Sequence, residues 1–245
     1  DAETRYREDP VRMLRAARFA GKLGFTLHPG TEAPLHRLAY MLDSVPAARL
    51  FDETMKLLLA GSAVPSFDML VSLGLLPHLM PDVAAALAEA PDSPGARLLR
   101  LGLENTDQRV RADKSVTPTF LFAVLLWPAI LRAIDAPNGP LPEDPQLLSS
   151  ACDAVMSQQL RRIAVPKRFG LPMRDLLLMQ PRFERRSGRR ALRLLDHPKF
   201  RAAYDFLVLR AAAGEVDPEV ADWWTRLQEM PEEQRIAEVE SRPRE

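Results

Sequence analysis

Apolar residues recur along most of this chain at the three- and four-residue spacing that is typical of amphipathic helices. We find no convincing alternating strand of five or more residues, and Leu, Ala and Arg dominate over β-branched residues. Prolines and glycines separate the apolar segments and mark helix starts and ends. The pattern predicts an all-α fold, an irregular multi-helix array with no substantial sheet. The expected helices cover 10–23, 32–42, 47–59, 65–73, 83–89, 93–103, 120–134, 146–163, 167–179, 188–195, 198–213 and 218–228.

The segment 135–145, rich in proline and turn residues, is the best linker in the sequence. We place a domain boundary there, between a helical domain over 1–136 and a second helical domain over 146–230. Residues 231–245 are polar and charged, which predicts a flexible tail that frays.

The most apolar segment, 120–134, is shorter than the roughly 20 apolar residues that a bilayer-spanning helix needs, and Pro128 interrupts it. We expect a buried core helix and no membrane contact. The sequence shows no signal peptide, and its single cysteine, Cys152, excludes an internal disulfide. These observations favour a cytoplasmic protein.

Positive charge is concentrated in one half of the chain although the formal net charge is zero. Residues 161–210 contain fourteen Lys or Arg against four acids, an excess that favours salt-dependent binding of a polyanion. Within the densest stretch, 182–190, Ser187-Gly188 predicts a turn and a new helix whose first amides add to an anion-binding surface. The alternative is a solvated arginine face that keeps a helical protein soluble. Phe183, Phe200 and Tyr204 lie among these cations and either stack on bases or fill the core.

A charged cluster leads into the first expected helix. Asp9 followed by Pro10 predicts a helix N-cap with proline at the first helical position. Arg12, Arg15 and Lys22 then share one side with Asp9, and the apolar positions 11, 14, 19 and 23 turn toward a core. A carboxylate accepts hydrogen bonds and a guanidinium donates them, so Asp9 and Arg12 in register can match the donor and acceptor of adenine. The alternative is a capping aspartate with solvated arginines.

The run 5–25 resembles the neck motif EDxxRxxR of the class II nucleotidyltransferases, the superfamily of bacterial poly(A) polymerases and CCA-adding enzymes. The motif falls on Glu8, Asp9, Arg12 and Arg15, and the resemblance implies that Asp9 and Arg12 select the base of the incoming nucleotide. The run 48–58 is similar to the next helical motif of the superfamily. There the resemblance implies a structural pair between Arg49 and Glu53.

Two later runs, 163–168 and 194–205, resemble the poly(A) polymerase branch, in particular around His197-Pro198-Lys199. The resemblance implies an enzyme that adds AMP from ATP to RNA 3′ ends, with the basic helices holding RNA. Two alternatives stay open: a CCA-adding enzyme that acts on tRNA with CTP and ATP, and a non-enzymatic helical scaffold, although no 33- to 45-residue repeat is present. The implied RNA contacts are Lys167, Arg168, Arg182, Arg185, Arg186, Arg189, Arg190, Arg193, Lys199 and Arg201.

The resemblance also implies a catalytic head, with a Gly-Ser phosphate-binding turn and an Asp-x-Asp metal pair on a strand, and we find neither here. We expect no catalytic residue, metal or cofactor in this chain, which is predicted to be inactive alone. Mg²⁺, ATP and the N-terminal head belong to the intact enzyme. The acidic clusters are more typical of loops and helix first turns than of metal sites; they are Glu143-Asp144, Glu215 with Asp217 and Glu219, and Glu232-Glu233.

Overall fold

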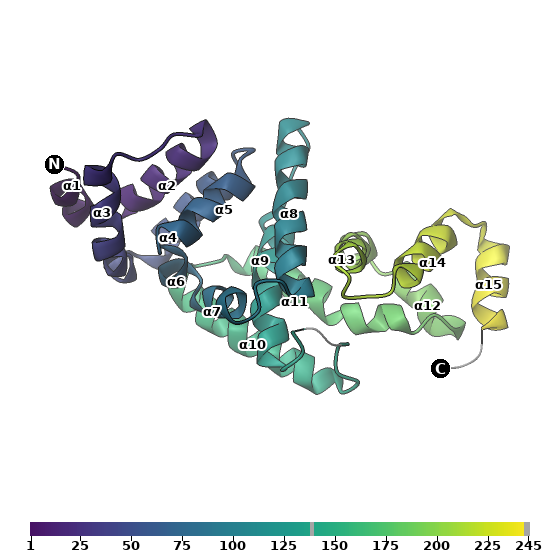
Figure 1. The fold of residues 1–245 in the computed structure, drawn as a ribbon. Helices are drawn as coiled ribbons and strands as arrows, with labels where there is room; N and C mark the ends of the chain where they lie inside the picture. The colour runs from purple at the N-terminus through teal and green to yellow at the C-terminus, as the bar shows by residue number, and fades with distance from the viewer. Residues whose placement is uncertain (138–139, 243–245) are drawn as a thin grey trace.

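A computed structural model describes residues 1–137 and 140–242, and within these ranges all regular structure is helical, which confirms the all-α prediction (Figure 1). The α-helices are α1 (Ala2–Glu8), α2 (Val11–Leu23), α3 (Pro29–Leu38), α4 (Ala47–Leu58), α5 (Ala63–Ser72), α6 (Leu76–Leu79), α7 (Pro81–Glu89), α8 (Pro94–Arg111), α9 (Pro118–Ala133), α10 (Pro145–Arg162), α11 (Lys167–Leu178), α12 (Gly188–Leu195), α13 (Phe200–Ala212), α14 (Pro218–Glu229) and α15 (Glu232–Ser241). Two 3₁₀ helices, η1 (Ala39–Ser44) and η2 (Gln180–Glu184), join α3 to α4 and α11 to α12.

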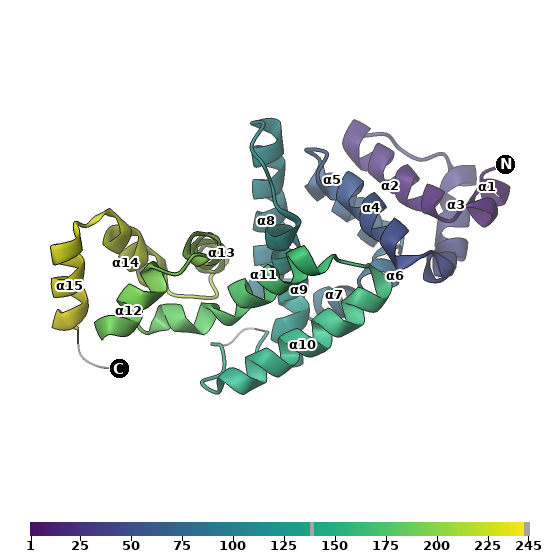
Figure 2. The same cartoon turned by 180° about the vertical axis from the view of Figure 1, so that it is seen from behind.

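The helices form an elongated array with the N-terminal helices at one end and the C-terminal helices at the other. Both views place α1, α2 and α3 at one extreme and α12, α14 and α15 at the opposite extreme, with α9 in the middle (Figure 1, Figure 2). We call α1 and α2 the neck, and α11 to α14 with η2 the leg. The neck and α12, which carries several of the predicted RNA contacts, therefore lie at different ends of the molecule, whereas α11 lies near the centre.

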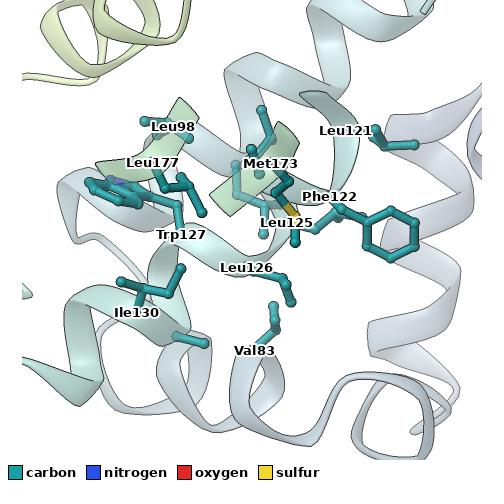
Figure 3. Packing of buried hydrophobic residues seen from close by; sticks show 14 of the residues in the cluster. Val83, Leu98, Leu121, Phe122, Leu125, Leu126, Trp127, Ile130, Met173 and Leu177 are labelled. Carbon is teal, nitrogen blue, oxygen red and sulfur yellow. The ribbon is translucent and has the colours of Figure 1, made fainter. Parts of the chain in front are cut away.

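Helix α9 is the centre of the core. Every residue from Leu121 to Leu131 is buried, and the helix packs against α7, α8, α10 and α11. Figure 3 shows Trp127 of α9 beside Leu177 of α11, and Leu126 facing Val83 of α7. The predicted core helix is confirmed, and α9 continues through Pro128. Within the described ranges, no helix is both long and apolar enough to cross a membrane.

Side-chain N-caps mark the starts of several of the predicted helices. The Thr117 hydroxyl accepts a hydrogen bond from the Phe120 amide at 3.3 Å, and the Ser93 hydroxyl accepts one from the Ala96 amide at 3.2 Å. Each is followed by proline at the first helical position, which lacks an N–H and tolerates the first turn. Gly24 adopts the left-handed conformation, with φ of 67°, that ends α2.

The tail differs from its prediction. Residues Glu232–Ser241 form α15, which packs against α12, so the expectation of a frayed tail is wrong for this segment. Val239 is buried, Glu238 accepts a 2.7 Å hydrogen bond from the indole of Trp223, and Arg235 donates hydrogen bonds to the carbonyls of Leu227 and Gln228. Residues 243–245 lie outside the described residues.

The expected linker connects α9 to α10, and its Asn138 and Gly139 lie outside the described residues. Packing crosses this loop, because α10 and α11 both contact α9. The division into two domains at 135–145 stays a prediction.

A buried polar network ties the leg to the centre of the molecule. Glu215, in the loop after α13, accepts a 2.8 Å hydrogen bond from Arg210 and a 2.7 Å hydrogen bond from the Trp127 indole. The Arg210 and Glu215 side chains are only 3% and 2% exposed. Trp223 and Trp224 of α14 are both buried.

Candidate nucleotide and RNA interface

The neck breaks into two helices at Asp9. The residue before a proline avoids the α conformation, and Asp9 is extended, with φ of −149° and ψ of 95°. The expected N-cap role of its side chain is wrong: α2 has no side-chain cap, and Asp9 contributes only its carbonyl, which accepts from the Arg12 amide at 3.0 Å. Residues before the break form a separate helix, α1, which the sequence pattern did not predict. The break leaves the Asp9 carboxylate free for other partners.

Helix α4 supplies one of those partners. Arg49 donates a 2.8 Å hydrogen bond from Nη2 to Oδ2 of Asp9, whose side chain is 18% exposed. The second oxygen, Oδ1, is buried and has no hydrogen-bond partner among the described residues. A buried acceptor without a donor costs about 1–3 kcal/mol, so Oδ1 is left as an unsatisfied acceptor next to the Arg49 pair.

Arg12 is held by the preceding helix. Its Nη1 donates to Oε2 of Glu8 at 2.9 Å and to the carbonyl of Arg5 at 3.1 Å. Glu8 also lies 3.5 Å from the Arg5 guanidinium. Arg12 and Asp9 therefore bind different partners. Arg12 also has N–H groups that its hydrogen bonds to Glu8 and Arg5 do not use.

The fourth motif residue, Arg15, lies 3.6 Å from Glu53 of α4, whose side chain is only 5% exposed. Lys56 donates a 3.0 Å hydrogen bond to the same oxygen of Glu53. The implied Arg49–Glu53 pair is therefore wrong: both side chains reach toward the neck, Arg49 to Asp9 and Glu53 to Arg15. A spacing of four residues places two side chains on one helix face, and the facing helix decides their partners.

The apolar side of the neck is only partly buried. Val11 and Leu14 are buried as expected, whereas Phe19 and Leu23 are 49% and 51% exposed, which corrects their placement in the core. Helix α2 packs against α4 and, most extensively, against α5, where Gly21 meets the backbone of Ser66.

The predicted RNA contacts fall into two groups at the two ends of α11. Lys167 and Arg168 begin this helix and are exposed, and the Arg168 guanidinium stacks on the ring of Phe169 at 4.8 Å. The other group begins beyond the end of α11, in η2 and α12. Because α11 has 12 residues, its length separates the groups by about 18 Å.

Six arginines of the second group have no ion pair within the described part of the chain. Five are exposed and Arg186 is half-buried; they are Arg182, Arg185, Arg186, Arg189, Arg190 and Arg193. The two remaining predicted contacts differ, because Lys199 pairs with Asp175 and Arg201 lies 3.1 Å from Asp205. Free positive charge is therefore concentrated around η2 and α12, where α12 begins at Gly188 as predicted.

The aromatic residues between these cations belong to the core. Phe183, Phe200 and Tyr204 are buried, and the Phe183 ring packs edge-on against Trp224 at 5.3 Å. The interpretation that they stack on bases is wrong. They hold η2, α13 and α14 together and so fix the surface that carries the arginines.

The acidic clusters have structural roles. Asp144 and Asp217 accept hydrogen bonds from the amides of Gln146 and Glu219 and so cap α10 and α14, and Glu215 is the partner of Arg210. Across residues 1–137 and 140–242, no group of three or more His, Cys, Asp or Glu has a metal-binding arrangement.

Two family models match the chain. Residues 24–87 match the probable RNA- and SrmB-binding site of polymerase A, and residues 143–245 match the polymerase A arginine-rich C-terminus. The first covers α3 to α6 and most of α7, including Arg49 and Glu53. The second covers the whole leg and the six unpaired arginines.

Curated relatives extend the similarity over nearly the whole chain. Poly(A) polymerase I of Escherichia coli O6:H1 is 44% identical over 232 residues, which cover 92% of this chain and 49% of the relative. The enzyme of the same name from Haemophilus influenzae is 36% identical over 247 residues, which cover 100% of this chain and 54% of the relative. The chain thus spans about half the length of these relatives.

Similarity to CCA-adding enzymes is local. The enzyme of Limosilactobacillus fermentum is 48% identical over 64 residues, which cover 26% of this chain and 16% of the relative. The poly(A) polymerases match the neck, the centre and the leg together, as well as the arginine-rich segment that carries the unpaired cations. The chain therefore belongs to the bacterial poly(A) polymerase family.

Proposed function

We propose that this chain is the part of a poly(A) polymerase that selects the incoming base and holds the RNA while AMP is added from ATP to the RNA 3′ end. The observation that carries the proposal is the Asp9 carboxylate, which Arg49 holds through one oxygen while the other is buried without a donor. The exocyclic amino group of adenine is a donor of the kind that Oδ1 lacks. A free N–H of Arg12 donates to a ring nitrogen of the same base.

The leg contributes RNA affinity. The six arginines of η2, α12 and the turn between them have no carboxylate partner among the described residues, so they can neutralise phosphates without first breaking an ion pair. Guanidinium groups bind phosphate oxygens in bidentate geometry, which suits them for the RNA backbone. The match of residues 24–87 to a probable RNA-binding site supports a further RNA contact in the segment from α3 to α7.

Nucleotidyl transfer requires groups beyond these. The intact enzyme is proposed to use Mg²⁺ and ATP, with its own N-terminal catalytic head as the partner of the neck. This chain alone is proposed to be inactive. Mg²⁺, when bound by the head, stabilises charge on the reacting phosphate. The residues of this chain act by binding and orienting the base and the RNA.

The experiment compares substrates of the full-length protein that contains this chain. We expect repeated addition of AMP to an unstructured RNA with ATP alone. Completion of a tRNA that lacks its 3′ end, requiring both CTP and ATP and stopping there, would instead establish the CCA-adding alternative. The scaffold alternative predicts no incorporation on either RNA.

A further inference from the structure

Four arginines of the leg surround one cavity. Arg182 of η2, Arg185 just after it, and Arg190 and Arg193 of α12 line a hollow of about 290 Å³ together with Leu194. None of the described residues that line it is acidic. The neighbouring Arg189 is exposed on the same helix but does not line the cavity. The positive charge of this surface is therefore gathered at a concave site.

The four guanidinium groups are not neutralised within the described ranges. None forms an ion pair there, whereas the nearby Arg174 and Lys199 are paired with Asp153 and Asp175. Arg193 makes only a long hydrogen bond, 3.4 Å, to the carbonyl of Arg189. Like charges so close to one another repel, and an anion at the centre removes that repulsion.

The size and chemistry of the cavity suit a phosphate group. A water molecule occupies about 30 Å³ in the liquid, so the cavity holds far more than one water. Guanidinium forks match the tetrahedral oxygens of phosphate, and Leu194 is the one apolar side chain among the described residues that line the cavity. None of the described residues that line the cavity is aromatic, so they offer no ring on which a base could stack.

We propose that this cavity binds one RNA backbone phosphate through Arg182, Arg185, Arg190 and Arg193 and so tethers the RNA at the leg, far from the neck. The proposal rests on the proposed function, because it specifies where the leg holds RNA. It predicts that the lining arginines contribute much more affinity than equally exposed arginines beside them.

Arg190→Ala and Arg189→Ala form a matched pair for the test. The two residues are adjacent on α12, both are exposed, and each substitution removes one positive charge. The binding of this chain to a fluorescent single-stranded RNA 15-mer is measured by anisotropy at several KCl concentrations. We expect Arg190→Ala to weaken binding about tenfold and to lower the slope of log affinity against log salt by about 0.7, the value for one lost single-strand phosphate contact. Arg189→Ala should weaken binding clearly less, by about twofold to threefold, because Arg189 lies outside the cavity and contributes only through the charge that it adds to the surface.

Two further measurements separate a shaped site from diffuse attraction. Arg190→Lys keeps the charge but loses the fork, so we expect it to retain only part of the affinity. Inorganic phosphate should displace RNA from the unmodified chain more effectively than chloride at equal ionic strength, and this difference should vanish in Arg190→Ala.

If Arg189→Ala and Arg190→Ala lost RNA affinity equally and Arg190→Lys kept full affinity, the phosphate site would be overturned. RNA binding by the leg would still stand. A second result would overturn both the phosphate site and RNA binding by the leg. It is an unchanged RNA affinity in the two single alanine variants and in the fourfold variant Arg182→Ala, Arg185→Ala, Arg190→Ala, Arg193→Ala. Circular dichroism checks that each variant is folded.

Discussion

Arg49 of α4 and Asp9 at the neck break form a 2.8 Å ion pair between positions 40 residues apart in the chain. The pair joins the motif residue expected to select the base to a helix that lies within the matched RNA-binding segment. It also fixes which oxygen of Asp9 is left for a ligand. Arg49 is therefore a positioning residue for the proposed base site.

Arg49→Ala tests this role in the full-length protein. We expect the ratio of kcat/KM for ATP to that for CTP or GTP to fall at least about tenfold, because Asp9 loses a charged hydrogen bond of roughly 1.5–3 kcal/mol. Stability should fall by less than about 1 kcal/mol, since the Arg49 side chain is 46% exposed.

Arg37→Ala is the control for Arg49→Ala. It also removes an exposed arginine from a close ion pair, with Glu3 at 2.7 Å, but it does not touch Asp9. Nucleotide preference should stay unchanged in this variant. An equal effect of both substitutions, or none from Arg49→Ala, contradicts the positioning role.

The buried network of the leg predicts a large stability difference between two similar ion pairs. Arg210–Glu215 and Arg226–Glu219 are both 2.8 Å apart, but only the first pair is buried. Glu215→Gln leaves Arg210 buried without its counter-ion and should cost about 3–5 kcal/mol, whereas Glu219→Gln should cost less than about 1 kcal/mol. Urea denaturation measures both free energies of unfolding. Similar losses in the two variants would show that Glu215 does not stabilise the leg as described.

Two helical glycines predict opposite effects of the same substitution. A Cβ at Gly21 would lie 2.8 Å from the backbone N and Cα of Ser66, so Gly21→Ala should destabilise the α2–α5 contact by about 1–3 kcal/mol. A Cβ at Gly170 of α11 would meet only Cε of Met156, at 4.0 Å. Gly170→Ala should therefore stabilise the chain by about 0.5–1 kcal/mol through helix propensity. Thermal melting should show shifts of opposite sign, and shifts of the same sign argue against the close α2–α5 contact.

Cys152 should be unreactive in the folded chain. The thiol is buried in α10, and burial raises its pKa to about 12, so the reactive thiolate is scarce at pH 8. We expect iodoacetamide to label Cys152 at pH 8 only after unfolding in guanidinium chloride. Rapid labelling of the folded chain would contradict its burial.

The same pKa shift sets a pH dependence. An unfolded thiol has a pKa of about 8.5, so the unfolded state releases its proton first as the pH rises. The contribution of Cys152 is fully present below pH of about 8.5 and is lost as the pH rises toward the folded pKa of about 12. Cys152→Ala should lose less stability between pH 8 and pH 10 than the unmodified chain, as measured by urea denaturation. Equal losses in the two proteins would contradict the shift.

Sequence patterns located most helices because proline, glycine and capping residues mark their ends. Helix α12 begins at Gly188 and ends at Leu195 as predicted, and α9 is the expected core helix. The polar composition of 231–245 concealed α15, which is held by contacts to α12 and α14 that no local pattern reveals.

The candidate site was predictable only in its residue types. The motif identified Asp9 and Arg12, but their partners depend on how α4 packs against the neck. Arg49 and Glu53 were therefore assigned to each other, although each contacts the neck. The cavity in the leg likewise depends on how arginines of η2 and α12 come together in space, which sequence spacing does not encode.

The most direct test of the account is the affinity of this chain for an unstructured single-stranded RNA as a function of salt. We predict a linear fall of log affinity with log salt, and loss of most binding when Arg185, Arg186, Arg189 and Arg190 are replaced by glutamate. Affinity that does not depend on salt, or that survives these four replacements in a folded chain, would contradict the assignment of RNA binding to the leg.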